Sequence, residues 1–252
     1  MNPSRAIPAV ALAVILGTGL WLRASGLDNM EFKADEAVAM EMARGIAEGR
    51  FTSTGLLSSV GLPNPPLFIY LLSIPMLINS SPLFTASFIA LCGTLAILIV
   101  YRIGTILRGR SAGLAAAALM AVSPWAVIYS RKIWAQDLLQ LMASMEMLAI
   151  LKMGRRDPGS RAASFAAPLV ALLAAQIHMS GTTLVLILAL VLSFRIRRPR
   201  WGPFIAGSLV GVAPLLPYVL HLWNNGFPAS LRAGTLWRGA PGLSSVPDRI
   251  AG

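Results

Sequence analysis

The stretch LFTASFIALCGTLAILIVYRIGTIL, residues 83–107, decides the class of fold, because it is mostly apolar and its only charged residue is Arg102. At 1.5 Å rise per residue, a helix of this length crosses the ~30 Å hydrocarbon core of a bilayer. The whole chain of 252 residues has the same character, with 12% charged residues and 56% hydrophobic residues. Soluble domains carry roughly 25% charged residues. The composition therefore excludes a single water-soluble globule and predicts an all-α, polytopic membrane protein.

Further apolar runs predict a bundle of about seven spans and one partial span. The full spans are expected at about 6–22, 83–107, 112–129, 138–153, 162–177, 182–194 and 204–223. The run at 67–78 is too short to cross and contains Pro75, so we expect a re-entrant or interfacial segment. The first run follows Arg5, as in a signal peptide, but Arg23 stands where small residues prepare a cleavage site. We therefore expect a retained first span.

Basic residues predict the orientation of these spans. If the run at 67–78 does not cross, 12 of the 21 basic residues fall in short loops on one side. The positive-inside rule makes that side cytoplasmic, which explains the net charge of +11 without a nucleic-acid partner. We expect a multi-pass protein of the inner (plasma) membrane with a cytoplasmic N-terminus. The extracytoplasmic segments are then 23–66, 130–137 and 178–181. The 12 basic residues are Arg5, Arg102, Arg108, Arg110, Lys152, Arg155, Arg156, Arg161, Arg195, Arg197, Arg198 and Arg200.

The first outer loop holds six of the ten acidic residues in the chain: Asp28, Glu31, Asp35, Glu36, Glu41 and Glu48. Within it, residues 34–49 repeat apolar side chains at three and four positions, which predicts an amphipathic helix on the membrane surface. Asp35 and Glu36 fall in its first turn, where carboxylates complement the helix dipole or carry chemistry. Adjacent helical residues diverge by ~100° and cannot both point at one atom. If Asp35 is the chemical group, Glu36 orients the loop or holds a cation.

The second outer loop, SRKIWAQD at 130–137, places two cations, an amide and a carboxylate around Trp134. One interpretation is an interfacial aromatic residue with snorkelling basic side chains. The other is a binding site for phosphate, for which arginine offers a planar fork and lysine a compact charge. The position of the cations outside, against the positive-inside trend, favours phosphate. The candidate ligands in this loop are Arg131, Lys132, Gln136 and Asp137.

Two further polar residues at the outer face are candidate ligands. Asn64 lies in GLPNPPL (61–67), where it either binds a ligand or belongs to a turn before the short apolar run. His178 lies at the end of a span, where it forms an interfacial hydrogen bond or binds a ligand. Two histidines are too few for a histidine-built metal site, so a divalent metal cofactor stays an open question.

These motifs, taken in order, resemble the GT-C membrane glycosyltransferases. More narrowly, they resemble glycosyltransferase family 39, the protein O-mannosyltransferase and lipid A aminoarabinose transferase type. The resemblance spans about residues 8–222. It rests on the Asp-Glu pair at 35–36, PNPPL at 63–67, RGRSAG at 108–113, SPW at 123–125, SRKIWAQD at 130–137 and QIHMSG at 176–181.

The resemblance implies transfer of a sugar from a polyprenyl-phosphate-linked donor to a lipid, glycan or protein acceptor outside the membrane. By position, Asp35 matches the acidic residue proposed as general base, Glu36 matches its partner, and Asp137 matches the second-loop acidic position. Some relatives have Glu-Lys before Pro-Pro-Leu, with the lysine near the lipid phosphate. Here Pro63 and Asn64 take those places, so that contact is missing.

Members of this family are usually about twice as long as this chain. The resemblance therefore implies a partial transmembrane glycosyltransferase-like domain at 1–223, followed by an extracytoplasmic tail at 224–252 that is cut short. Whether these 252 residues are active alone stays open.

Transfer of a sugar from a lipid phosphate requires few catalytic groups. A sugar phosphate needs positive charge to stabilise its departing phosphate, and the acceptor needs a base, so one carboxylate and a cationic pocket suffice for an inverting transfer. The alternatives are a non-catalytic membrane protein and a lipid or sugar transporter (flippase). Transporters place ionisable groups near the bilayer midplane, where this sequence has only Glu146. The polar groups at the outer interface favour the transferase.

Overall fold

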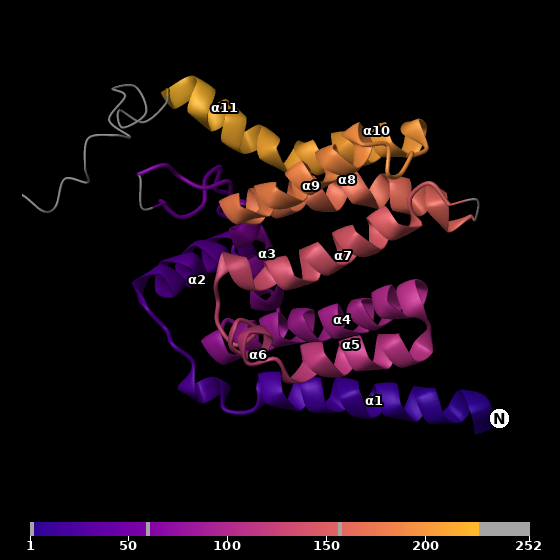
Figure 1. Ribbon diagram of the computed structural model, residues 1–252. Helices are drawn as coiled ribbons and strands as arrows, with labels where there is room; N and C mark the ends of the chain where they lie inside the picture. The colour runs from indigo at the N-terminus through magenta and orange to yellow at the C-terminus, as the bar shows by residue number, and fades with distance from the viewer. Residues whose placement is uncertain (1–2, 59–60, 156–157, 227–252) are drawn as a thin grey trace, which may run out of the picture.

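The computed structural model is a bundle of α-helices that lie side by side (Figure 1), and it describes residues 3–58, 61–155 and 158–226. In those ranges the only β-type pairing is an isolated bridge between Leu57 and Pro63. The α-helices are α1 (Pro3–Ala24), α2 (Ala34–Ala47), α3 (Leu67–Met76), α4 (Pro82–Arg108), α5 (Arg110–Val122), α6 (Pro124–Ile128), α7 (Leu139–Lys152), α8 (Gly159–Ile177), α9 (Thr182–Ser193), α10 (Trp201–Val212) and α11 (Leu216–Asn225). The short 3₁₀ helices are η1 (Leu27–Asn29), η2 (Ala135–Leu138), η3 (Met179–Gly181) and η4 (Ala213–Leu215).

The expected class, an all-α helical membrane protein, is confirmed, but the number of full-length spans needs correction. Four helical stretches in the described residues are long and apolar enough to cross a membrane, fewer than the seven expected. They are Ile7–Ala24, Pro82–Arg108, Gly159–Ile177 and Trp201–Asn225, the last interrupted by η4.

Three runs that were expected to span form shorter helices. The run at 112–129 is divided, because the backbone of Ser123 is not helical (ψ of 121°) and Pro124 has no N–H to continue α5. Helix α7 has 14 residues and α9 has 12. At 1.5 Å per residue, these helices rise only about 18–21 Å, well short of a ~30 Å hydrocarbon core.

The short apolar run forms α3, whose ten residues rise about 15 Å, half of the hydrocarbon core. Leu72 and Ile69 of α3 are buried in the largest core cluster, which also takes residues from α2, α4 and the second outer loop. The amphipathic helix expected at 34–49 is α2. Gly49, with φ of +88°, follows its C-cap residue Glu48. Helices α2 and α3 share this core cluster and lie at one end of the bundle (Figure 1).

Close backbone contact joins α4 and α5. A Cβ on Gly104 would lie 2.8 Å from the Cα of Gly113, and a Cβ on Gly113 would lie 2.2 Å from the Thr105 hydroxyl. Such small residues let membrane helices approach closely and gain dispersion contacts. Helix α1 packs against this pair around Ile97 and Ala117, while a separate core joins α7, α8, α9 and α10.

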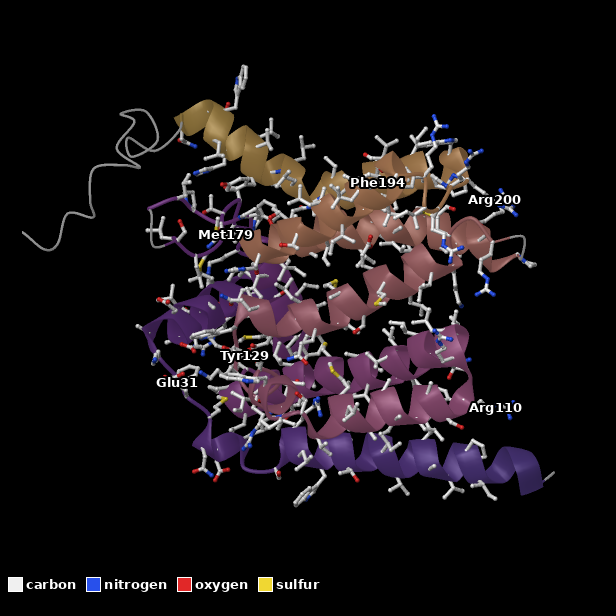
Figure 2. The ribbon with its side chains drawn as sticks, viewed as in Figure 1. Glu31, Arg110, Tyr129, Met179, Phe194 and Arg200 are labelled. Carbon is white, nitrogen blue, oxygen red and sulfur yellow. The ribbon has the colours of Figure 1, made fainter. Side chains whose placement is uncertain are left out.

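The bundle has two ends of different character (Figure 2). Arg110 and Arg200 lie at one end, which we call the basic end, together with the N-terminus. Glu31, Tyr129 and Met179 lie at the opposite end, which we call the pocket end. The first and second outer loops meet there.

Candidate functional site

In each of the two outer loops, a helix begins with the same type of hydrogen bond, from a backbone N–H to a carboxylate three residues later. In the first loop, the Glu36 carboxylate accepts the backbone N–H of Lys33 at 3.0 Å. In the second, the Asp137 carboxylate accepts the backbone N–H of Trp134 at 3.1 Å. Each carboxylate satisfies an N–H at a helix start that has no partner within the helix. Glu36 and Asp137 are each 1% exposed, so each loop is fixed by a buried acidic residue.

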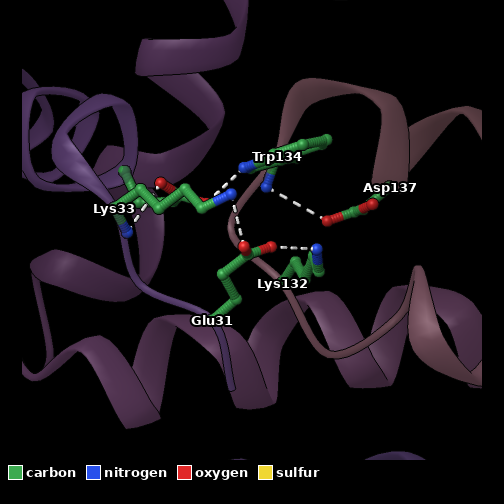
Figure 3. Close-up of polar contacts among 6 residues, drawn as sticks. Glu31, Lys33, Lys132, Trp134 and Asp137 are labelled. Atoms are coloured by element: carbon green, nitrogen blue, oxygen red, sulfur yellow. Dashed lines mark hydrogen bonds and ion pairs between the residues drawn. The ribbon is translucent and has the colours of Figure 1, made fainter.

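A side-chain contact joins the two loops. The indole N–H of Trp134 donates to Oε1 of Glu36, while Oε2 of the same carboxylate holds Lys33 (Figure 3). Both oxygens of Glu36 are thus engaged. Asp35, one residue earlier in α2, is exposed, in agreement with the divergence of adjacent helical side chains. Asp35 therefore keeps a free approach to solvent and to ligands.

A chain of charges lies beside this contact. The Glu31 carboxylate pairs with the ammonium groups of both Lys33 and Lys132 (Figure 3). Hydrogen bonds from Lys132 and Lys33 lower the pKa of Glu31 to about 2, so the group is ionised at neutral pH. The Lys132 ammonium also lies 4.7 Å from the centre of the Trp134 ring, a cation–π contact. Sequence reasoning did not select Lys33, whose part depends on where α2 begins.

Arg23, near the end of α1, holds the second outer loop in place through hydrogen bonds. Its guanidinium is buried and donates to the carbonyls of Met120 and Ala121 at 3.0 and 2.9 Å, and to the Ser130 hydroxyl at 3.2 Å. Pro124 has no N–H to offer the Met120 carbonyl, so Arg23 supplies a donor where α5 ends. Sequence reasoning used Arg23 only to reject a cleavage site. Its position at the outer end of an apolar helix was the available signal.

Arg131 and Asp137 hold the second loop itself. Arg131 is half-buried and donates to the Gly26 carbonyl at 2.6 Å, which ties the loop to the segment after α1. Burial raises the pKa of Asp137 to about 8, so its carboxyl is largely protonated at neutral pH. Its Oδ1 has no hydrogen-bond partner among the described residues. A protonated, buried acid cannot serve as a general base at pH 7.

A pocket of about 290 Å³ opens between the loops. Five of the eight residues selected from the sequence line it: Asp35, Glu36, Asn64, Gln136 and His178. The other three, Arg131, Lys132 and Asp137, are not in its lining. Much of the remaining wall is apolar and comes from α3 and from the end of α8, including Phe68, Ile69 and Ile177. The pocket therefore combines one exposed carboxylate, two amides and an imidazole above an apolar floor.

Asn64 closes one wall of the pocket. Its side-chain amide donates to the Leu56 carbonyl at 2.9 Å, and its backbone pairs with Gly55 and Leu56 at 2.7 and 2.8 Å. The paired segments 55–58 and 61–64 are held in turn by α11, where the Tyr218 hydroxyl donates to the Pro63 carbonyl at 2.7 Å. Nothing in the sequence pattern pointed to Tyr218, because the contact spans 155 residues.

His178 and Gln136 form the opposite wall. Nδ1 of His178 accepts the backbone N–H of Ser180 at 3.1 Å and lies 2.7 Å from the hydroxyl of the same residue. Nε2 faces the side-chain amide of Gln136 at 3.1 Å. Burial lowers the pKa of His178, which keeps the imidazole neutral at pH 7. The wall thus offers neutral hydrogen-bonding groups.

A second pocket, of about 530 Å³, lies beside the first and shares Trp134 and Gln136 with it. Its lining is mostly apolar and aromatic and includes Trp125 and Tyr129, whose stacked rings have centres 5.9 Å apart. Sequence reasoning did not anticipate this pocket, because α5, α6, η2 and α7 each supply part of it.

In the part of the chain that the structure describes, no three His, Cys, Asp or Glu side chains lie close enough together to hold a metal ion.

Residues 63–221 match the family model described as dolichyl-phosphate-mannose-protein mannosyltransferase. The match covers more than half of the chain and includes the second outer loop and His178, whereas Asp35 and Glu36 precede it. Comparison with curated proteins gave no match, and neither did comparison with solved structures.

Proposed function

The chain belongs to the dolichyl-phosphate-mannose-protein mannosyltransferase family, and from this premise we propose a reaction for the pocket. Family membership makes the chain a mannosyltransferase-like membrane glycosyltransferase. We propose that it transfers the sugar of a polyprenyl-phosphate donor to an acceptor hydroxyl or amine, with inversion. One observation carries this proposal: Asp35, Asn64, Gln136 and His178, from four separate segments, line one pocket beside an apolar one.

Asp35 is the proposed general base. It lines the pocket and is exposed, whereas Glu36 is engaged by two donors. The acceptor oxygen or nitrogen attacks the anomeric carbon from the face opposite the phosphate. The bond from that carbon to the phosphate oxygen breaks with its electron pair, and the acceptor proton passes to Asp35. A positioned base of this kind contributes about 10²–10⁴ in rate.

Lys132 is the proposed contact for the donor phosphate, with Lys33 as its partner. The Glu31 carboxylate between their ammonium groups supports this role, because the same pair would hold a phosphate that displaced it. Arg131 is half-buried one residue before Lys132 and holds the loop through Gly26. Asp137 holds the loop in the same way through Trp134. We assign these two residues to positioning of the phosphate site.

The remaining pocket residues suit the sugar and the lipid. Neutral groups on Asn64, Gln136 and His178 form hydrogen bonds with hydroxyls without competing for the proton that Asp35 removes. The aromatic second pocket, with Trp125 and Tyr129, suits an isoprenoid chain. We place the pocket end outside and the basic end in the cytoplasm, on the positive-inside rule.

The test is sugar transfer by membranes that contain the full chain, with radiolabelled polyprenyl-phosphate mannose as donor. Asp35→Asn should lower transfer at least ~100-fold. Glu41→Gln is the matched control, because Glu41 lies in the same helix, is exposed and pairs with Arg44 at 3.3 Å. It should transfer at the wild-type rate. Turnover by Asp35→Asn equal to wild type would remove Asp35 from the mechanism, and no transfer by wild type would overturn the proposed function.

A further inference from the structure

We infer that Trp134 is the positioning residue of this site: its indole N–H fixes the carboxylate beside the general base, and its ring separates the two pockets. The inference rests on the proposed function and extends it. From the sequence, Trp134 was explained as an interfacial aromatic residue. In the structure it has three polar neighbours, each on a different part of the residue.

The first step concerns Glu36. One of its oxygens accepts from the backbone of Lys33 and the other from the indole of Trp134. A carboxylate with both oxygens engaged and 1% exposure has a single orientation. Asp35 directly precedes it in the first turn of α2, so the backbone that carries Asp35 is fixed at the next residue. The indole N–H of the second loop therefore sets the direction of the base on the first loop.

The second step concerns the choice of tryptophan. An aromatic ring has a negative face and a positive edge. The Lys132 ammonium lies over the face at 4.7 Å, and the Glu36 carboxylate lies at the N–H edge. The backbone N–H of Trp134 is held separately by Asp137 at 3.1 Å. Phenylalanine would keep the contact of the face with Lys132 but has no donor for Glu36.

The third step concerns the wall between the pockets. Trp134 lines both the pocket of about 290 Å³ and the pocket of about 530 Å³. A ligand with its sugar in the first and its chain in the second passes along this ring. Removal of the ring would join the two spaces and leave the chain without its contact. Trp134 should therefore affect both turnover and donor affinity, through different parts of its side chain.

Two variants separate these parts in the assay with labelled polyprenyl-phosphate mannose. Trp134→Phe keeps the ring and loses the N–H, so kcat should fall about tenfold with KM for the donor within about twofold. Trp134→Ala loses both, so KM should also rise, by about tenfold. Trp201→Phe is the matched control, since Trp201 is exposed at the start of α10. It should behave as wild type. A wild-type kcat in Trp134→Phe would overturn the inference.

A double-mutant cycle guards against a general effect on folding. If Trp134 acts through Glu36, then Trp134→Phe should change little once Glu36→Ala is present, both in kcat and in melting temperature. Additive losses in both quantities would overturn the inference. The melting-temperature cycle needs no turnover, so it decides the contact even if the wild-type chain transfers no sugar. That last result would overturn the proposed function alone.

Discussion

The two ends of the bundle treat charge in opposite ways. At the pocket end, Arg23 and Glu36 are buried, and each forms a hydrogen bond with a distant segment, Arg23 with the end of α5 and Glu36 with Trp134. At the basic end, Arg110 and Arg198 are exposed. Burial of a charged group costs free energy unless partners compensate for the lost water. A single polar substitution at the pocket end should therefore alter both packing and chemistry. The charges at this end are held in place by hydrogen bonds.

The comparison is tested most strongly at Arg23. Arg23→Met removes the donors to the Met120 and Ala121 carbonyls, so we expect the free energy of unfolding to fall by about 2–5 kcal/mol. Arg198→Met, its counterpart at the basic end, should stay within about 0.5 kcal/mol of wild type. Thermal unfolding of both purified variants in detergent gives the difference. Equal losses in the free energy of unfolding would mean that arginine side chains at the two ends contribute equally to stability.

A smaller effect is expected at Asp137, and it depends on pH. Burial raises its pKa from 3.8 to about 8, so between these values the folded chain keeps a proton that the unfolded chain releases. The stabilisation is full below about pH 4 and is lost as pH rises through about 8. The wild-type melting temperature should therefore decline over this range.

Asp137→Asn cannot lose this proton, and its amide still accepts from the Trp134 N–H. Melting temperatures of this variant should decline less between about pH 4 and about pH 8. Parallel curves for the two proteins would show that Asp137 titrates as an exposed group and would weaken the contrast between the ends.

The smallest effect, with the opposite sign, is expected at Arg110. This residue begins α5, where the positive end of the helix dipole disfavours a cation. Arg110→Gln should therefore raise the free energy of unfolding by about 0.3–1 kcal/mol, measured by the same melts at low salt. A clear loss of stability would indicate that Arg110 has a binding partner, and that charged side chains at the basic end are also held in place by hydrogen bonds or ion pairs.

Local patterns predicted the class of fold and the helix α2, because composition and apolar spacing are properties of the sequence alone. The number of full-length spans was wrong, since Pro124 divides one run and the helices at α7 and α9 are short. Hydropathy measures whether a segment prefers lipid. It does not fix where the backbone leaves the helix, which depends here on a proline and on the donors of Arg23.

The sequence identified several residues that line the pocket but did not predict the contacts that hold them in place. Charged and amide side chains in the outer loops identified five residues that line one pocket. The part played by Trp134 stayed hidden, because it depends on a contact with Glu36, which lies 98 residues earlier in the chain. The part played by Lys33 stayed hidden because it depends on where α2 begins. The aromatic pocket was missed for the same reason. Spacing along a chain does not reveal which faces of distant helices meet.

The hydrogen bond from Tyr218 to Pro63 has a consequence for biosynthesis. A ribosome adds about 5–20 residues per second, so the 155 residues between these partners take on the order of ten seconds to make. During that interval the nascent chain holds its acidic loop without the brace that α11 supplies. The wall of the pocket at Pro63 is therefore completed only after α11 has been synthesised.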